Sequence, residues 1–249
     1  MSAAKASVAV IIPTFNEAES IGAVIAALPR VIVDRVIVDR VIVVDGGSTD
    51  GTPERAQAAG AEVIAVGRGY GRACLAGAEA AAGADILVYM DGDGADDPAV
   101  IAALIAPIAS GDWDFVIASR ARGVREPGSM SWHQLVAGRV IGAMIGLLYG
   151  ARYTDMCALR AIRRDALLRL GMREMTYGWN LEMQMRAARA HLRVHEVPVD
   201  YRCRIGGQSK VAGSLSGSLK AGIRILATFA RVALEQNSLP PRSGGEGIS

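Results

Sequence analysis

The sequence predicts a single α/β domain built on an open, mostly parallel sheet that is flanked by helices. Two observations predict this fold class. The chain has 249 residues, of which 51% are hydrophobic, and short β-branched runs alternate with helical patterns over residues 8–118. A chain of this length and hydrophobic content can bury one sizeable core. Strands that alternate with helices at this spacing indicate βαβ units, which build parallel sheets.

Five strands are expected in the first part of the chain, at residues 8–12, 41–44, 61–66, 86–90 and 115–118. The first is an apolar, largely β-branched run that ends at Pro13, which is typical of a buried parallel strand. The helices between the strands are expected at 16–28, from Thr52 onward, at 69–82 and at 97–108. Thr52-Pro53-Glu54 supplies a cap and a proline in the first turn, which marks a helix start.

The pattern changes after Arg120. A loop is expected over 122–134, followed by an apolar helix at 135–148, helices from Asp165 and at 180–190, a strand at 194–199 and a last helix at 215–236. We therefore expect one domain over 1–236 with two halves, 7–120 and 121–236. Residues 237–249 are rich in Pro, Gly and Ser and are expected to form a disordered tail.

A five-residue repeat lies within the first half. Val-Ile-Val-Asp-Arg occupies 31–35 and again 36–40, and the related run Val41–Asp45 leads into a glycine turn. Because an odd repeat length exchanges the two faces of a strand, the copies are not interchangeable. We expect the third copy to be the core strand and one earlier copy to be a surplus insertion. The alternative is one longer strand.

Charge and cysteine usage argue against several classes of protein. The formal net charge is only +2, so a nucleic acid partner is not expected. The cysteines Cys74, Cys157 and Cys203 form no CxxC pair, which disfavours a zinc site or a disulfide framework and favours a reducing cytoplasm. The N-terminus shows no signal-peptide pattern, and no window supplies the ~20 uncharged apolar residues of a spanning helix. We expect a soluble or peripheral protein.

Acidic side chains follow three of the expected strands. Glu17, Asp45 and the pair Asp91 and Asp93 each stand just after a strand, and ligands bind at the carboxyl ends of strands in open α/β sheets. Two aspartates separated by one residue at an extended strand end point the same way, so the pair is a candidate site for Mg²⁺ or Mn²⁺. The alternative is a simple turn of Asp and Gly. A calcium-binding EF-hand loop does not fit the residues that follow.

Basic residues that are able to hold phosphate come later in the chain: Arg120, Arg122, Arg125, Arg202, Arg204 and Lys210. Most surface arginines are simply solvated, but Arg204 and Lys210 flank a Gly-Gly turn and are expected to fold over a bound diphosphate. The glycine-rich segment Gly67–Gly71 matches neither GxGxxG nor a Walker sequence. We interpret it as a helix entry near the nucleotide.

Six segments, taken in order, resemble family 2 glycosyltransferases with the Rossmann-like GT-A fold, and especially dolichyl-phosphate mannose or glucose synthases and their bacterial polyprenyl-phosphate relatives. The segments are Ile11–Glu17, Val43–Thr52, Asp91–Asp93, Ala118–Arg120, Asp155–Arg160 and Glu196–Lys210. Two departures from the family pattern are Ala95, where some synthases carry a polar side chain that supports the metal, and the run Met156–Leu159 before Arg160.

The resemblance implies a metal-dependent, inverting enzyme that moves a sugar from a UDP- or GDP-sugar to polyprenyl or dolichyl phosphate. Its implied nucleotide-sugar-binding residues are Pro13, Phe15, Glu17, Asp45, Asp91, Gly92, Arg204 and Lys210. Asp91 and Asp93 would bind Mg²⁺ or Mn²⁺, Arg120 would meet the acceptor phosphate, and the implied catalytic residues are Asp93, Arg120 and Asp155. The first half of the domain would then bind the donor and the second half the acceptor.

The acceptor stays open at this point. An ionised phosphate needs no general base, whereas a soluble hydroxylated acceptor needs one, for which Asp155 is the candidate unless it is structural. A non-catalytic nucleotide-sugar-binding protein is the third hypothesis. The apolar helix at 135–148 and the last helix, which carries Lys220, Arg224 and Arg231 near one face, are candidates for peripheral contact with the inner face of a membrane. Packing in the core, or in a homodimer for the last helix, is the alternative.

Overall fold

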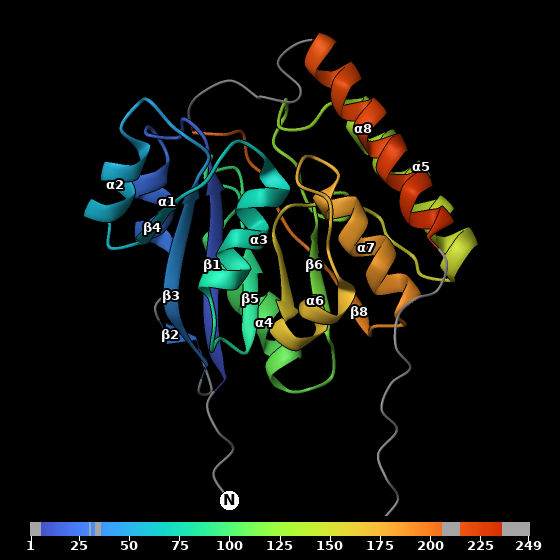
Figure 1. Ribbon diagram of the computed structural model, residues 1–249, viewed down its shortest axis with the longest axis horizontal. Coiled ribbons are helices and arrows are strands. Elements are labelled where there is room, and N and C mark those ends of the chain that lie inside the picture. The colour runs from blue at the N-terminus through green and yellow to red at the C-terminus, as the bar shows by residue number, and fades with distance from the viewer. Residues whose placement is uncertain (1–5, 30, 33–35, 206–214, 236–249) are drawn as a thin grey trace, which may run out of the picture.

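The computed structural model describes residues 6–29, 31–32, 36–205 and 215–235, and these residues form one α/β unit (Figure 1). The strands are β1 (Ser7–Thr14), β2 (Val31–Ile32), β3 (Val36–Asp45), β4 (Glu62–Ala65), β5 (Ile86–Tyr89), β6 (Phe115–Ser119), β7 (Arg160–Arg163) and β8 (Val194–Pro198). The helices are α1 (Ile21–Ala27), α2 (Thr52–Ala58), α3 (Tyr70–Ala80), the 3₁₀ turn η1 (Pro98–Val100), α4 (Ile101–Ala109), α5 (Trp132–Tyr149), α6 (Arg164–Leu170), α7 (Trp179–Arg189) and α8 (Leu215–Leu234).

All described strands belong to one sheet with the order β2-β3-β1-β5-β7-β6-β8, and β4 pairs with β3. The pairs β1–β3, β1–β5, β3–β4 and β6–β8 are parallel, so the predicted fold class is confirmed. Strand β7 was not predicted. It runs antiparallel between β5 and β6, so its amino end lies at the edge where β5 and β6 end. The segment that precedes β7 is thereby brought to the ligand-binding edge.

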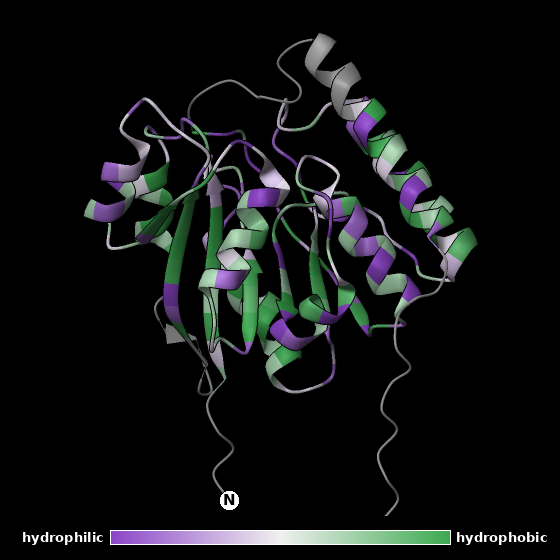
Figure 2. Cartoon of the chain, in the orientation of Figure 1, coloured by the Kyte–Doolittle hydropathy of each residue, from purple (hydrophilic) through white to green (hydrophobic). Residues whose placement is uncertain are grey.

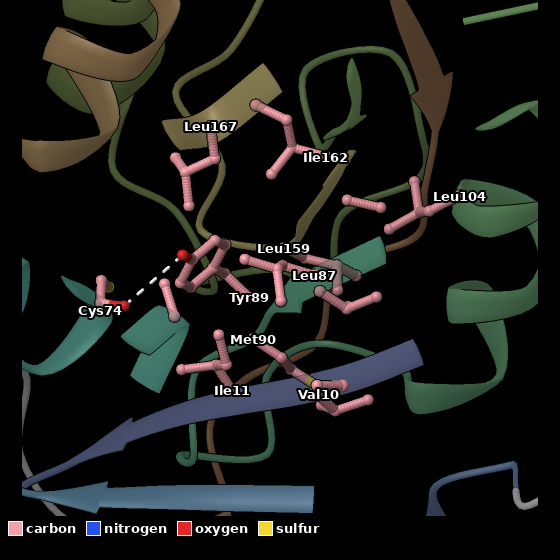
Figure 3. Close-up of a cluster of buried hydrophobic side chains, with 14 of the residues drawn as sticks. Val10, Ile11, Cys74, Leu87, Tyr89, Met90, Leu104, Leu159, Ile162 and Leu167 are labelled. Carbon is pink, nitrogen blue, oxygen red and sulfur yellow. Dashed lines mark hydrogen bonds between the residues drawn. The ribbon is translucent and has the colours of Figure 1, made fainter. Parts of the chain in front are cut away.

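The core consists of apolar strands covered by helices on both faces. Figure 2 shows the central strands β1, β3, β5 and β6 as mostly hydrophobic. In Figure 3, Cys74 of α3 and Leu104 of α4 approach β5 from opposite sides, and the buried Tyr89 donates its hydroxyl to the Cys74 carbonyl over 3.5 Å. The Trp179 ring of α7 meets Tyr89 edge-on, with 6.3 Å between ring centroids. Strands buried on both faces explain why their sequences are nearly continuous apolar runs.

The repeat is divided between two strands. The third copy, Val41–Asp45, is buried in the core part of β3 as expected, but β3 also contains the second copy, so the longer-strand alternative holds for these two. The first copy contributes β2, which pairs antiparallel with the start of β3. A bulge at Asp39 lets Val38 pair with Val8 and Arg40 with Ala9. This extra residue compensates for the odd repeat length, so that Val38 shares a face with Val41.

Among the helix boundaries that differ from the prediction, two have a clear local cause. Helix α1 begins at Ile21, because a turn in which Ser20 and Ile21 donate their backbone N–H groups to the Glu17 carbonyl precedes it. Helix α5 begins at Trp132, where a loop was expected. Ser131 and Gln134 form a capping box, with the Ser131 backbone N–H donating to Gln134 Oε1 over 2.9 Å. The S-x-x-Q spacing is the signal that would have identified this start.

Helix α8 packs on α7 through buried ion pairs. Glu182 of α7 is fully buried, and its Oε1 accepts hydrogen bonds from Arg186 over 2.9 Å and from Arg231 of α8 over 3.0 Å. Arg231 therefore faces α7, as the core-contact alternative for the last helix expects. Thr228 and Val232 of α8 are also buried, which makes this a core contact. Within the described residues, no helix is long and apolar enough to cross a membrane.

Candidate active site

The site lies where the loops after β1, β3 and β5 meet. Gly46 donates its backbone N–H to the Thr14 carbonyl over 2.9 Å. The backbone N–H of Asn16 donates to Ser48 Oγ over 2.8 Å, and that of Glu17 to Thr52 Oγ1 over 2.9 Å. Because adjacent parallel strands end side by side, these contacts hold two predicted nucleotide-binding segments together at one edge of the sheet.

Asp45 stabilises its own turn. The carboxylate is buried, and its Oδ2 accepts hydrogen bonds from the backbone N–H groups of Gly47 and Ser48 over 2.9 and 2.8 Å. The Ser48 hydroxyl donates to Oδ1. These contacts fix the shape of the glycine turn, and any contact of Asp45 with a nucleotide would be made from this fixed position.

The ring of Phe15 is covered by the guanidinium of Arg68. The Arg68 guanidinium lies 3.7 Å from the ring centroid, which is the geometry of a cation–π contact. Pro13 is half-buried at the end of β1, where it pairs with Val44. Arg68 was not predicted as a site residue. The signal for it was its place between two glycines directly before α3.

The loop after β5 concentrates carboxylates. Asp91 and Asp93 lie beyond the strand in a turn, not at an extended strand end as the sequence argument assumed, and Gly94 has φ of +78°. Gly92 is packed so that a Cβ would lie 3.0 Å from Thr14 Cγ2. Asp93 is buried, and its Oδ2 forms an ion pair with Arg204 at 3.0 Å. Asp93, a predicted metal ligand, therefore contacts Arg204, which was predicted to bind the diphosphate.

A third carboxylate, Asp96, joins this loop and was missed from the sequence. It is buried, and burial together with the charge of Asp91 raises its pKa to about 8. Burial and the charge of Asp93 likewise raise the pKa of Asp91 to about 7. The recurrence of aspartate at 91, 93 and 96 was the available signal. Crowded carboxylates of this kind favour a nearby cation.

Arg120 and Asp155 form a bidentate ion pair. Arg120 Nε donates to Asp155 Oδ2 and Nη2 to Oδ1, both over 2.8 Å, and the Arg120 backbone N–H adds a third bond over 2.9 Å. Burial alone would raise the pKa of Asp155, but the bonds from Arg120 outweigh it and lower that pKa. The ring of Tyr201 lies under the guanidinium, 4.9 Å away. Tyr201 belongs to the segment Glu196–Lys210 that carries the family resemblance, but the sequence analysis gave it no role.

The other predicted phosphate ligands lie in different settings. Arg125 donates to the Arg120 carbonyl over 2.9 Å, Arg122 to the Glu196 carbonyl over 3.0 Å and Arg202 to Asp97 over 2.9 Å. Lys210 lies outside the described residues. Among the later basic side chains, Arg204 bonds to Asp93 of the acidic loop, residues 91–96. Arg120 also lies close to this loop, since its positive charge counteracts the raised pKa of Asp91 and of Asp96.

The glycine-rich segment before α3 permits close packing. A Cβ on Gly71 would lie 2.9 Å from the backbone carbonyl carbon of Glu174, and one on Gly69 would collide with the Met175 carbonyl. The Arg72 backbone N–H donates to that carbonyl over 3.0 Å. The glycines thus admit the 174–175 loop against the start of α3, next to Arg68.

The family model for glycosyl transferase family 2 matches residues 9–171. This range contains the loops after β1 and β3, the acidic loop and the Arg120–Asp155 pair.

The chain belongs to glycosyl transferase family 2.

This transferase is similar to several named proteins. It is 38% identical over 218 residues to an uncharacterized glycosyltransferase of Mycobacterium tuberculosis strain H37Rv, covering 86% of this chain and 94% of that protein. It is 33% identical to the undecaprenyl-phosphate mannosyltransferase of Micrococcus luteus, covering 83% and 88% of the two chains. The identity with the polyprenol monophosphomannose synthase of Mycolicibacterium smegmatis is 32%, covering 82% and 81%. The activity class, glycosyl transfer, follows from the family.

The fold of the transferase also matches solved structures. The Mycobacterium tuberculosis glucosyl-3-phosphoglycerate synthase, crystallised with Mn²⁺, UDP and phosphoglyceric acid, superposes with a TM-score of 0.74. The match has 23% identity and covers 94% of this chain and 80% of that one. At this identity the likeness establishes the GT-A fold.

The carboxylates of the acidic loop could supply part of the coordination shell of a hard divalent ion. In the part of the transferase that is described, no group of three or more His, Cys, Asp and Glu side chains is arranged to hold a metal. Asp91 and Asp93 nevertheless offer carboxylate oxygens, and burial together with the charge of Asp93 raises the pKa of Asp91. Mg²⁺ and Mn²⁺ sites of nucleotide enzymes commonly have one or two carboxylates and complete their coordination with water and phosphate.

Proposed function

We propose that this glycosyltransferase moves a sugar, with inversion, from a nucleotide diphosphate donor to a polyprenyl-type lipid phosphate. The observation that carries the proposal is the meeting of the acidic loop at Asp91–Asp96 with two arginines, Arg204 and Arg120. Carboxylates for a cation and guanidiniums for phosphates are the groups that a reaction between two phosphate-bearing substrates needs.

The donor half, residues 7–120, would hold the nucleotide. Phe15 and Glu17 follow β1, and Asp45 follows β3, so the base and ribose would lie across these strand ends. Asp91 and Asp93 would hold Mg²⁺ or Mn²⁺, which neutralises charge on the diphosphate leaving group when bound. Arg204, within 3.0 Å of Asp93, would contact the same diphosphate.

The acceptor half, residues 121–236, would receive a phosphate together with Arg120 at its border. Arg120 uses Nε and Nη2 for Asp155, and its Nη1 has no hydrogen bond within the described residues. That nitrogen would meet the acceptor. A phosphate oxygen is ionised at neutral pH and attacks without a general base. Asp155 would then act as a positioning residue, because a carboxylate that accepts a bidentate pair and has a lowered pKa is a weak base.

Two relatives support a lipid acceptor through their names, undecaprenyl-phosphate mannosyltransferase and polyprenol monophosphomannose synthase. Such an acceptor would place the enzyme at the inner, cytoplasmic face of the membrane. A soluble acceptor is the second candidate, since phosphoglyceric acid is bound in solved structures with a similar fold. That reaction uses a hydroxyl nucleophile and would need a base, a role for which the pairing of Asp155 with Arg120 is unsuited.

A transfer assay tests the proposal. The full chain would be incubated with UDP- and GDP-sugars, with Mn²⁺ or Mg²⁺, and with either undecaprenyl phosphate in detergent or soluble phosphoglyceric acid. We expect labelled sugar in the lipid fraction and a loss of turnover of about 10²–10³-fold in Asp93→Asn, since one group at the reacting charge is removed. The exposed Asp112→Asn is the matched control.

The other outcomes decide between the candidates. Label in the phosphoglyceric acid product alone would favour the soluble acceptor and overturn the lipid acceptor. Tight donor binding with neither transfer nor slow hydrolysis in any combination would overturn the enzymatic proposal in favour of a binding protein.

A further inference from the structure

A groove of about 780 Å³ lies beside the second half of α5. One wall is α5 itself, and the other is formed by residues 121–122, 150 and 152–154. Three arginines line it: Arg122, Arg139 and Arg152. The groove is separate from the acidic loop, although Arg122 and Thr154 directly adjoin the Arg120–Asp155 pair in sequence.

Glycines shape the floor of the groove. Gly142 and Gly146 lie along one side of α5, and Gly150, directly after the helix, continues the spacing of four residues. A Cβ on Gly142 would collide with the Tyr153 carbonyl, and one on Gly146 would lie 3.3 Å from the Ala151 carbonyl. The 151–154 segment therefore lies directly against the helix backbone, and the long side chains of the groove are its arginines, Tyr153 and Leu147.

The charged side chains that line the groove are all positive, because no Asp or Glu lines it. Arg139 and Arg152 are exposed and have no carboxylate within ion-pair distance in the described residues, and Arg122 donates to a backbone carbonyl, that of Glu196. The Glu196 carboxylate is already bonded to the backbone N–H and hydroxyl of Thr154, over 2.8 and 2.7 Å. Guanidiniums grouped without acidic partners suit a phosphate.

An apolar face runs along the same helix. Val136, Val140, Met144 and Leu147 follow one another at intervals of four, four and three residues, and all are exposed, Leu147 by 88%. Trp132, at the start of this face, is 75% exposed. Leu147 also lines the groove, so the arginines lie along one border of the apolar face. An apolar face bordered by arginines is typical of helices that lie in the headgroup region of a bilayer.

We propose that this groove binds the phosphate of an anionic phospholipid headgroup, with the apolar face of α5 resting at the acyl boundary. The charge of the groove and the adjoining apolar face together select this partner: a free phosphate would use the arginines but would leave Trp132, Val140 and Leu147 in water. The proposal goes beyond the proposed function, since it concerns bilayer lipids and not the sugar acceptor.

Vesicle flotation without donor or acceptor tests the groove, so a failure of sugar transfer does not affect the result. The full chain would be mixed with vesicles of phosphatidylcholine, alone or with phosphatidylglycerol. We expect flotation with phosphatidylglycerol only, and a decrease in affinity of about 10–30-fold in the double variant Arg139→Gln/Arg152→Gln, because each arginine near an anionic surface contributes to binding. Leu147→Ser should also weaken flotation.

Matched controls lie on α6 and its following loop. Arg169→Gln/Arg173→Gln removes the same charge from exposed positions, and Leu168→Ser removes an apolar side chain that is 55% exposed. Both should float as the unchanged chain does. Equal flotation of the groove variants and their controls, equal flotation with phosphatidylcholine alone, or no flotation at all would overturn the proposal. So would calorimetric binding of inorganic phosphate to the groove arginines without any vesicle binding, which would assign the groove to a free anion.

Discussion

At the scale of single residues, the site is organised by two arginine–aspartate pairs with different consequences. Arg204 meets Asp93 near the surface, with 31% of the Arg204 side chain exposed. Arg120 meets Asp155 in a mostly buried position, with 17% and 5% of the side chains exposed. The first pair is able to exchange partners with a ligand, whereas the second is a fixed unit, because separating a buried ion pair leaves an unpaired charge.

The first pair predicts opposite effects of Arg204→Ala on metal affinity and on turnover. Without donor, the variant should bind Mn²⁺ more tightly, because the competing cation beside Asp93 is gone. Turnover should fall by about 10²–10³-fold, because the positive charge that would stabilise the diphosphate leaving group is lost. Titration calorimetry with Mn²⁺ and initial rates measure the two effects. Arg202→Ala, which removes the neighbouring pair with Asp97, is the control; a fall in Mn²⁺ affinity in Arg204→Ala would contradict this account.

The second pair predicts a stability loss with a defined pH dependence. Asp155→Asn should lower the free energy of unfolding at neutral pH by about 3–5 kcal/mol, since Arg120 would be left buried and unpaired. The pKa of Asp155 is lower in the folded than in the unfolded protein, so its contribution is present above the unfolded pKa and is lost as the pH falls through the folded pKa. Urea unfolding from pH 6 downward should therefore show a weaker decline in the variant than in the unchanged chain. Parallel declines would assign the acid sensitivity to other groups.

At the scale of elements, glycine placement determines which loops approach which helices. Gly71 and Gly22 both lie in helices, but only Gly71 has backbone atoms of another segment at its Cβ position, whereas Gly22 has no atom within 4 Å. Gly71→Ala should cost about 1–3 kcal/mol of stability through overpacking against Glu174. Gly22→Ala should stabilise the protein by about 0.5–1 kcal/mol, because alanine favours a helix interior. Urea unfolding measures both, and equal effects would show that the 174–175 loop yields without cost.

Local patterns predicted most of these elements, while the site required long-range information. Strands such as β1 and β5 are apolar runs that are recognised from the sequence. Because parallel strands end at the same edge of the sheet, the position of the acidic residues after them could also be predicted. Strand β7 was missed because arginines stand at both of its ends, and Arg160 is fully buried. Arg120 and Asp155 were each identified, but their pairing depends on the antiparallel insertion of β7. No spacing in the sequence encodes that insertion.

At the scale of the whole molecule, α8 is connected to the proposed donor site by a continuous set of contacts. Arg231 of α8 bonds to Glu182, whose Oε2 accepts from the backbone N–H groups of Arg173 and Glu174 over 2.9 and 2.6 Å. Thr228 of α8 donates to the Glu174 carboxylate over 3.0 Å. The same loop packs on the start of α3, which follows Arg68 and its contact with Phe15. Packed contacts of this kind transmit displacement when the elements are rigid.

This connection predicts that Arg231→Met weakens both the fold and nucleotide binding. Stability should fall by about 1.5–3 kcal/mol, because a charge-assisted hydrogen bond to a buried carboxylate is lost. The affinity for UDP or GDP should fall several-fold, because the 174–175 loop no longer holds the start of α3 in place. Arg169→Met, on α6 and with 59% of its side chain exposed, should change neither quantity. If Arg231→Met lowered the unfolding free energy while nucleotide titration gave an unchanged affinity, α8 would be a structural clamp on α7 alone, and the donor site would be independent of it.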